Sequence, residues 1–595
     1  MRAWHCVPRA GKGGNPMRKL LRMAGMGLAA LGMTAAVLLH YTATGVRTHY
    51  VLIALLALAC LMLVRRAVAR VTRREACAAL GFGGLLAAAL LVGSAIRAQA
   101  GLLPPSGAAM LLLRWAGLTL LWGAVLACLL TAPVRTPLTP PRAYDRRFFF
   151  VAWAVILACW LPYFLFYFPG AATNDTLDQY LQVLSGTYNN HHPVAHTLLL
   201  AAVTKGAMAL GFSDVAAVAI FTLLQMLGLS AFFAHMACFL RARVKARWLA
   251  YATVLLFALN PMHAYFSISL WKDIPFSAMA VWWILLIWRA VETRGEAFGR
   301  RRFVAAWVAV MLAVAFLRNN GIALLVGTLP FLIVHFKARR RLLAFTGAAV
   351  VGFYALVQGP VFSLLHIEQT RLTEALGIPL QQVAYTVYSG EALTDAQQET
   401  IDQLLPREEI VAHYEPVYTN PIKFHPQLQY QHFMQNLGTY GRLWLELGIQ
   451  HPTAYLRAHA DLLYRFWYPD QSVLCIFLYN GEPFGEVSAL VTRPVVKQFA
   501  PVQRLEPERL TVEYPATLPL FSSGALIWYV LAACCCLWVR RARPYLLVLL
   551  PLLMLWASLM VSAPFGEARY VYALYCAVPL VVCLAVYGGR QHDDT

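Results

Sequence analysis

Long apolar segments alternate with short polar or basic segments along the chain. Many of them run for roughly 15 to 25 residues, about the length at which an α-helix crosses the hydrocarbon core of a bilayer. This pattern predicts an all-α polytopic membrane protein with about 14 transmembrane helices. The predicted spans lie near 22–41, 49–64, 76–96, 107–132, 148–168, 214–240, 248–265, 274–292, a ninth before Arg318, a tenth before Lys337, 342–363, 519–539, 544–563 and 569–588.

Basic clusters between the apolar segments set the expected orientation. Lys and Arg concentrate on the cytoplasmic side of membrane proteins, and here they recur in alternate connections, from 65–74 to 540–543. The apolar segment 197–212 is predicted to lie along the membrane surface, because it contains Lys205 and a crossing there would break the alternation. Both termini are then cytoplasmic, and the loop from Pro169 and the region 365–518 face outward.

Four regions follow from this topology. We expect a four-span N-terminal membrane region at 1–147 and a membrane core at 148–364 with its first outer loop at 169–213. An extracytoplasmic soluble domain at 365–518, mostly helical, and a three-span C-terminal region with a cytoplasmic tail at 519–595 complete the chain. Region 365–518 has a different composition, with more than half of the 28 acidic residues. Within it an amphipathic helix is predicted at 394–405, and two further helices separated at His451.

Composition narrows the function classes. With 60% hydrophobic and 13% charged residues, the chain does not resemble an ordinary soluble protein. The net charge of +21 would suggest nucleic-acid binding in a soluble chain, but the basic residues follow the orientation rule, so we exclude that partner. Most of the 12 cysteines lie inside apolar segments without a CxxC pair, which supports neither a disulfide framework nor a zinc site.

The loop at 169–197 carries the densest candidate chemistry, with two carboxylates, three histidines and no Lys or Arg, so we expect no cation to pair with its Asp175. Asn174 is predicted to cap a helix whose first turn carries Asp175 and Asp178 on one face. Gln179 lies beside them, Gly186 is predicted to end the helix, and the His191-His192-Pro193 step to begin another. The alternative is that the acids only complement the helix dipole and the histidines are solvated at the interface.

Other polar clusters are predicted on the same outer side. They comprise Trp271, Lys272, Asp273, Arg318, Asn319, Asn320, Glu567, Arg569 and Tyr570. Charged residues at span ends are costly unless they are paired or wet, so each is a functional candidate. Lys272, Arg318 and Arg569 are expected to have too few acids near them to neutralise them. Lys272 and Asp273 could instead be an interfacial pair, and Glu567 with Arg569 a local ion pair. Together the clusters predict a site for an anionic, lipid-linked substrate, with cations for its phosphate and a carboxylate as base.

These features resemble the GT-C glycosyltransferases, multi-pass enzymes that take a sugar from a polyprenyl-phosphate donor outside the cytoplasmic membrane. The resemblance rests on Asp175 in the first long outer loop, on HHPVAHTLLLAAVTKGAMALG and on GEARYVYALYCAVPL. The chain also resembles a bacterial multi-pass family of unknown function through NDTLDQ, HHP, WKD, RNNG and LELGIQHPTAYLRAH, over about 150–590. The resemblance implies location in a bacterial inner membrane.

By that resemblance, Asp175 is the general base, and Lys272, Arg318 and Arg569 contact the donor phosphate. Asp178, His191 and His192 are further catalytic candidates, and the other clustered residues, including Asn174 and Gln179, are substrate-binding candidates. No cofactor follows with certainty, although His191 with Asp175 could hold a divalent metal ion. The expected partners are a lipid-linked sugar donor and membrane lipids.

Two other functions stay open. A transporter or flippase of lipid-linked glycans would bind the same phosphates without a base, but it predicts internal repeats and mid-span charges, of which Arg114 is the clearest. A non-catalytic membrane assembly factor would use region 365–518 as its binding surface.

Overall fold

The computed structural model describes residues 16–43, 50–98, 107–132, 138–471, 487–496 and 518–589. Among these residues the chain is helical, with no β-strand and three isolated β-bridges. The prediction of an all-α multi-pass membrane protein is confirmed at this level. Internal contacts divide the chain into two units, 1–95 with 99–133 and 96–98 with 134–595.

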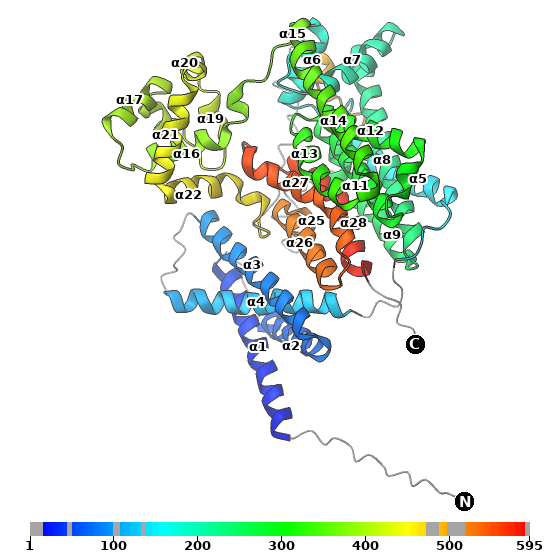
Figure 1. Cartoon of the computed structure of the whole chain (residues 1–595), viewed down its shortest axis with the longest axis vertical. Helices are drawn as coiled ribbons and strands as arrows, with labels where there is room; N and C mark the ends of the chain where they lie inside the picture. The colour runs from blue at the N-terminus through cyan, green and yellow to red at the C-terminus, as the bar shows by residue number, and fades with distance from the viewer. Residues whose placement is uncertain are drawn as a thin grey trace, which may run out of the picture. The chain divides into compact units, whose positions relative to one another are not determined.

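The first unit is a bundle of four helices (Figure 1). They are α1 (Pro16–Ala43), α2 (Tyr50–Arg70), α3 (Arg73–Arg97) and α4 (Ala108–Thr131). Small residues let α3 and α4 approach closely, since a Cβ on Gly83 would lie 2.4 Å from the Thr119 carbonyl oxygen. The Trp115 indole N–H also donates to the Gly84 carbonyl at 3.0 Å.

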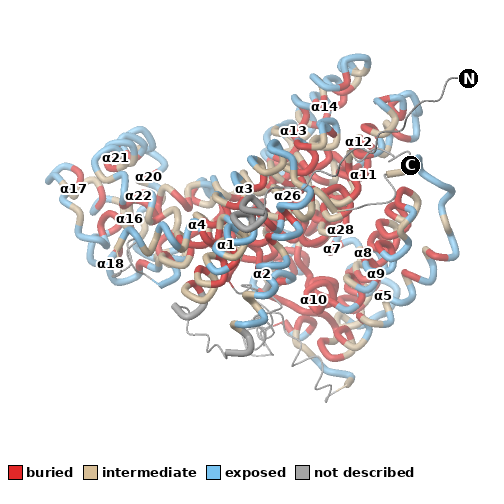
Figure 2. Tube along the Cα trace, turned by 90° about the horizontal axis from the view of Figure 1, so that it is seen from below, coloured by how far each residue is buried: buried red, intermediate tan, exposed pale blue. Residues whose placement is uncertain are grey.

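The second unit contains the remaining long apolar helices. Its core is α11 with α28, and every residue of the short helix α10 is also buried (Figure 2). These helices are α5 (Arg146–Phe166), α8 (Asp214–Arg243), α9 (Arg247–Leu259), α10 (Pro261–Ile268), α11 (Asp273–Glu292), α12 (Arg301–Leu317), α13 (Gly321–His335), α14 (Arg340–Leu356), η3 (Val357–Val361), α15 (Phe362–Leu364), α25 (Leu518–Phe521), α26 (Ser523–Val539), α27 (Leu546–Ser562) and α28 (Tyr572–Tyr587). The short helices η1 (Glu296–Gly299), η2 (Lys337–Arg339) and η8 (Arg543–Tyr545) connect them.

The number of spans stays a prediction. By length and apolarity, nine described helices can cross a membrane, or ten if the bent pair α9 and α10 is one span. The bend of 56° follows from Asn260, whose side chain caps α10, and from Pro261 in its first turn. Each of the fourteen predicted segments is helical, but α2, α12, α13 and α26 do not meet the criterion by themselves.

Two helices follow α5 and carry the polar loop. They are α6 (Asn174–Ser185) and α7 (Val194–Ala209). The prediction that Asn174 caps α6 is wrong, because Thr173 is the cap and forms a capping box with Thr176. Asn174 is the first helical residue, and its side chain is left free to face a cavity. Gly186 ends α6 as predicted, in the left-handed conformation at φ 74°.

Residues 365–471 fold into a helical domain with an apolar core that includes Ile401, Leu405, Phe433 and Leu447. The predicted helix near 394–405 is α17, capped by Thr394, and His451 separates α21 from α22 as predicted. Residues 472–486 and 497–517 of the predicted soluble domain lie outside the described residues. The elements are η4 (Leu372–Glu374), α16 (Gly377–Tyr388), α17 (Asp395–Leu404), α18 (Arg407–His413), α19 (Asn420–Lys423), α20 (Tyr430–Gln435), α21 (Leu437–Gln450), α22 (Pro452–Leu463) and η5 (Tyr464–Phe466), followed by η6 (Ser488–Leu490).

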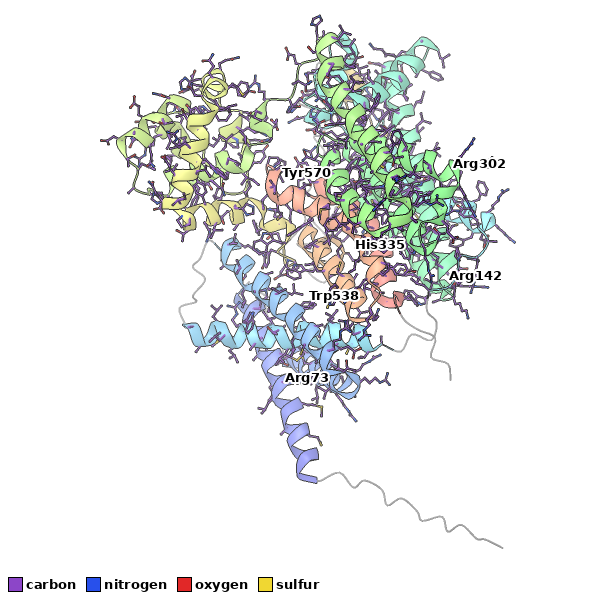
Figure 3. The ribbon with its side chains drawn as sticks, viewed as in Figure 1. Arg73, Arg142, Arg302, His335, Trp538 and Tyr570 are labelled. Atoms are coloured by element: carbon purple, nitrogen blue, oxygen red, sulfur yellow. The ribbon has the colours of Figure 1, made fainter. Side chains whose placement is uncertain are left out.

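The second unit separates two kinds of polar residues. Arg142 and Arg302, which belong to predicted cytoplasmic clusters, lie at the right edge of this unit in the view of Figure 3, whereas Tyr570 lies nearer the 365–471 domain.

We expect cysteines introduced at Thr187 and Glu399 to react with a membrane-impermeant maleimide in intact cells. Both positions are exposed and both lie in segments predicted to face outward. Arg301→Cys, also exposed, is the control and should react only after permeabilisation. Protection of Thr187→Cys or Glu399→Cys in intact cells would overturn the topology.

Candidate functional site

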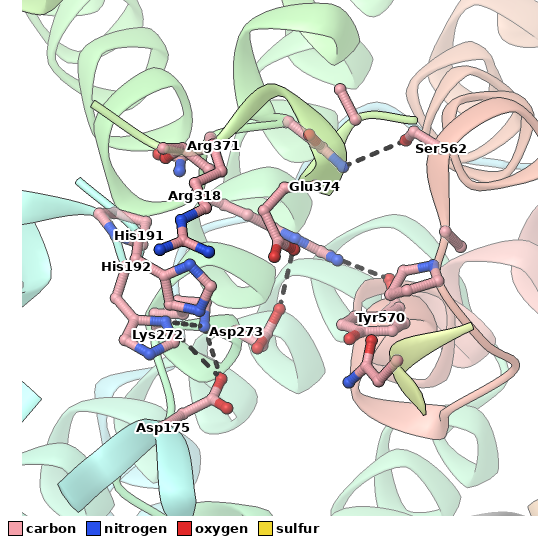
Figure 4. A pocket seen from close by; sticks show the side chains of 18 of the residues that line it. Asp175, His191, His192, Lys272, Asp273, Arg318, Arg371, Glu374, Ser562 and Tyr570 are labelled. Atoms are coloured by element: carbon pink, nitrogen blue, oxygen red, sulfur yellow. Dashed lines mark hydrogen bonds and ion pairs between the residues drawn. The ribbon is translucent and has the colours of Figure 1, made fainter. Parts of the chain in front are cut away.

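A polar cavity of about 1030 Å³ lies where α6, α11 and the loop before α28 meet the 365–471 domain (Figure 4). We call it the polar pocket. Its lining includes five carboxylates and five cations, which is unusual beside a membrane. Of the site residues predicted from the sequence it contains Asn174, Asp175, Asp178, His191, His192, Trp271, Lys272, Asp273, Arg318, Asn319, Asn320, Glu567, Arg569 and Tyr570.

Asp175 lies between two cations in this pocket. Its Oδ2 atom accepts from the Lys272 ammonium at 2.6 Å and from the Arg569 guanidinium at 2.7 Å. The expectation that no cation would pair with Asp175 is therefore wrong. It rested on the composition of the loop alone, whereas the partners come from α11 and from η9 (Ala568–Val571), far along the chain.

The cations set the charge state of Asp175. Burial by itself would raise the pKa of this carboxyl, but Arg569 and Lys272 outweigh it and hold the pKa well below its usual value. The side chain is still 22% exposed, so it faces the pocket. Asp175 is thus ionised at neutral pH and accessible, and while both cations hold it, it is a weak base.

His192 is neutral beside this cluster. Its Nδ1 atom accepts from the Lys272 ammonium at 2.9 Å, which places the ring proton on Nε2, 3.5 Å from the Asp178 carboxylate. Burial, reinforced by the charge of Lys272, lowers the pKa of His192 to about 4. Lys272 is therefore shared between an acid and an imidazole.

Glu567 and Arg569 form a pair that also includes Asp175. The Arg569 Nε donates to Glu567 at 2.7 Å, and the guanidinium lies 5.1 Å from the centre of the Trp271 ring. Burial raises the pKa of Glu567 to about 7, although Arg569 opposes the shift. A purely local ion pair is excluded, because Arg569 also contacts Asp175.

Arg318 is also buried and has partners of its own. Its Nε lies 3.3 Å from Asp273 Oδ1, at the start of α11, and its guanidinium donates to the Tyr570 carbonyl at 3.2 Å. The prediction that the outer cations have too few acids to neutralise them is wrong, since Lys272, Arg318 and Arg569 each have an acidic partner.

Three amide side chains were predicted to bind substrate, beyond Asn174, and they have different surroundings. Asn319 donates to the Asn190 carbonyl at 3.2 Å and Asn320 to the Ser562 hydroxyl at 3.4 Å, both at the pocket wall. Gln179 does not line the pocket. It is buried between α6 and α7, where it donates to Thr197 at 2.9 Å and contacts His196, so its role there is packing.

The groups suited to a metal ion differ from the predicted pair. Asp178, His191 and His192 each offer one ligand atom, and these atoms lie within 4.8 Å of one another. Asp175 is not in this group, and its carboxylate contacts Lys272 and Arg569. If a divalent ion binds, the donor set is Asp178 with the two histidines.

The 365–471 domain supplies pocket residues that sequence reasoning missed. Arg371, Glu374 and Lys423 line the cavity, and Lys423 donates to Glu374 at 2.8 Å. Backbone bonds hold the domain against the loop, with Asn190 N–H donating to the Glu368 carbonyl at 2.8 Å. The charged residues that follow the apolar segment ending at 364 could have been recognised as site candidates from the sequence. Nothing in the neighbouring sequence indicated that they pack against the loop at 169–197.

A family model described as a family of unknown function, DUF6020, matches residues 184–595. The chain belongs to this family. The match includes HHP, WKD, RNNG and GEARYVYALYCAVPL and begins after Asp175 and Asp178. Neither a curated protein nor a solved structure matches the chain.

We expect His192→Asn to make the protein less sensitive to mild acid. The unfolded chain takes up a proton on this histidine near pH 6.5 and the folded chain only near 4, so acid favours unfolding. Between pH 7 and 5 the wild type should lose about 2 kcal/mol through this group. Thermal unfolding of both proteins at the two pH values measures the difference, and an equal loss in the variant would contradict the buried neutral state.

Proposed function

We propose that this protein is a GT-C-type glycosyltransferase that moves a sugar from a polyprenyl-phosphate donor to a cell-envelope acceptor on the outer side of the bacterial cytoplasmic membrane. The observation that carries the proposal is the contact of one accessible carboxylate, Asp175, with two cations, Lys272 and Arg569. A base for the acceptor and donors for a phosphate are the two requirements of such a transfer.

The pocket chemistry fits an anionic donor. Lys272 offers an ammonium and Arg569 a planar guanidinium, which are the side chains that bind phosphate by charge-assisted hydrogen bonds. Arg318 is a weaker candidate for direct contact than its position in the sequence suggested, because it is bound to Asp273 and to the Tyr570 carbonyl. The proposed role of Arg318 is to position the backbone next to Arg569, through its contact with the Tyr570 carbonyl.

In the proposed step, an acceptor hydroxyl attacks the anomeric carbon of the sugar. A carbon–oxygen bond forms there, the bond to the phosphate oxygen breaks, and the polyprenyl phosphate leaves with its electron pair. Asp175 takes the hydroxyl proton. The departing phosphate gains negative charge, which Lys272 and Arg569 stabilise.

The low pKa of Asp175 gives donor binding a second effect. While both cations hold the carboxylate, they weaken it as a base. A donor phosphate competes for the same two cations, so its arrival raises the basicity of Asp175 at the moment when a base is needed. Without a donor, the Asp175 carboxylate stays paired with Lys272 and Arg569 and remains a weak base.

We expect Asp175→Asn to lower turnover by about 10² or more while the protein remains folded and inserted. The amide keeps the shape of the side chain and removes the base. Sugar transfer from a radiolabelled lipid-linked donor in proteoliposomes measures the effect. Asp395→Asn is the control that should keep full activity, because Asp395 is exposed on α17 and does not line the pocket. Full sugar transfer by Asp175→Asn would remove Asp175 as the base. Donor binding without sugar transfer in the wild type would favour the transporter or the assembly factor.

We expect Lys272→Gln to bind polyprenyl phosphate roughly ten- to a hundred-fold more weakly, because a charge-assisted contact of about 1.5 to 3 kcal/mol is lost. Lys205→Gln is the matched control, since Lys205 is exposed on α7 and does not line the pocket. Calorimetric titration in nanodiscs compares the two variants. Equal affinity would remove Lys272 from the phosphate site.

A further inference from the structure

A second cavity, of about 480 Å³, lies inside the 365–471 domain. We call it the apolar cavity. Leu, Ile, Val, Ala and Phe side chains from α16 to α21 line it, and its polar side-chain groups are those of Tyr440 and Trp444. The Trp444 indole N–H already donates to Gln382 at 2.9 Å. Its volume is in the range of ligand sites and its walls suit hydrocarbon.

This cavity is poorly suited to water or to a polar ligand. An ordered buried water needs two to four polar partners, and the lining offers almost none. Left empty, the cavity costs the domain the dispersion contacts that its wall atoms would otherwise make. An apolar occupant restores those contacts without requiring a hydrogen-bond partner.

Leu372 connects the apolar cavity to the polar pocket, because it lines both. Its side chain is 37% exposed, so the boundary between the two cavities is open to solvent at this residue. The neighbouring Arg371 lines the polar pocket, and its guanidinium lies 5.3 Å from the centre of the Tyr430 ring. No carboxylate among the described residues forms an ion pair with Arg371. The Arg371 side chain is therefore located where the polar pocket borders the apolar cavity.

We propose that the apolar cavity binds the phosphate-proximal isoprenoid units of the lipid-linked donor, with Arg371 directed at the phosphate end. The proposal rests on the proposed function for the identity of the lipid. It adds that the domain takes up the start of the hydrocarbon chain, which the membrane helices would otherwise have to hold alone. Chain and phosphate then occupy adjoining cavities that share Leu372.

Two substitutions should block the cavity. Ala384→Phe places a ring at a fully buried position of its wall. Gly441→Leu adds a side chain on α21 where a Cβ meets open space, so it should be tolerated by the fold. Gly438→Leu is the matched control, because Gly438 lies on the same helix, is equally open and does not line the cavity.

The experiment is photolabelling of the full-length protein in nanodiscs with farnesyl phosphate that carries a photoreactive group in its chain. We expect mass spectrometry to place the label on peptides of 372–444, at least tenfold less in Ala384→Phe and Gly441→Leu and unchanged in Gly438→Leu. Arg371→Gln should weaken labelling by farnesyl phosphate and leave labelling by the uncharged photoreactive farnesol unchanged. Circular dichroism and thermal unfolding verify that each variant is folded.

Labelling confined to membrane helices, or equal labelling in folded Gly441→Leu and wild type, would overturn the proposal. The outcome is separable from that of the proposed function. Cavity labelling in a protein that transfers no sugar would leave the cavity proposal standing and remove the enzyme. Sugar transfer without labelling of the apolar cavity would overturn the cavity proposal and leave the proposed enzyme standing.

Discussion

The bridge from Lys272 and Arg569 to one oxygen of Asp175 is the interaction on which the polar pocket depends. It joins the start of α6, the start of α11 and the turn before α28, three elements that are distant in the chain. Each charge lies at the edge of an apolar helix, where an unpaired ion is costly, so the partners stabilise one another. Removing Asp175 would leave Lys272 partly buried without its acidic partner, whereas Arg569 would keep Glu567.

The same bridge explains how a reactive group can persist at the membrane surface. An ionised carboxylate held by two cations neither takes up protons readily nor attracts stray cations. Under the proposed function, the substrate supplies the anion that replaces it. Neutral His192 on the other side of Lys272 is suited to the exchange, because it accepts a hydrogen bond from the ammonium without adding charge.

Much of the architecture was predictable from the sequence, and its reasons are local. The length of an apolar segment predicts a membrane helix. The end of α6 at Gly186 and the cap of α17 at Thr394 were also predictable, because a helix end depends on a few neighbouring residues. The cap at Thr173 was missed since Asn174 has the same preference and only packing decides between them. Membership of the pocket was also largely predictable, because charged residues at span ends are rare. Pairings such as Asp175 with Arg569 were not, since they depend on how distant helices are placed.

The 365–471 domain is attached to the helical core by main-chain atoms at two separate places. One is the bond between Asn190 and Glu368, and the other is the isolated bridge between Tyr418 and Phe565, where Thr419 also approaches the Pro564 carbonyl at 3.4 Å. Backbone bonds do not depend on which side chain a residue carries. The lining of the pocket can therefore diverge through substitution while the domain stays anchored, so that members of the family could differ in the molecules they accept and still share one frame.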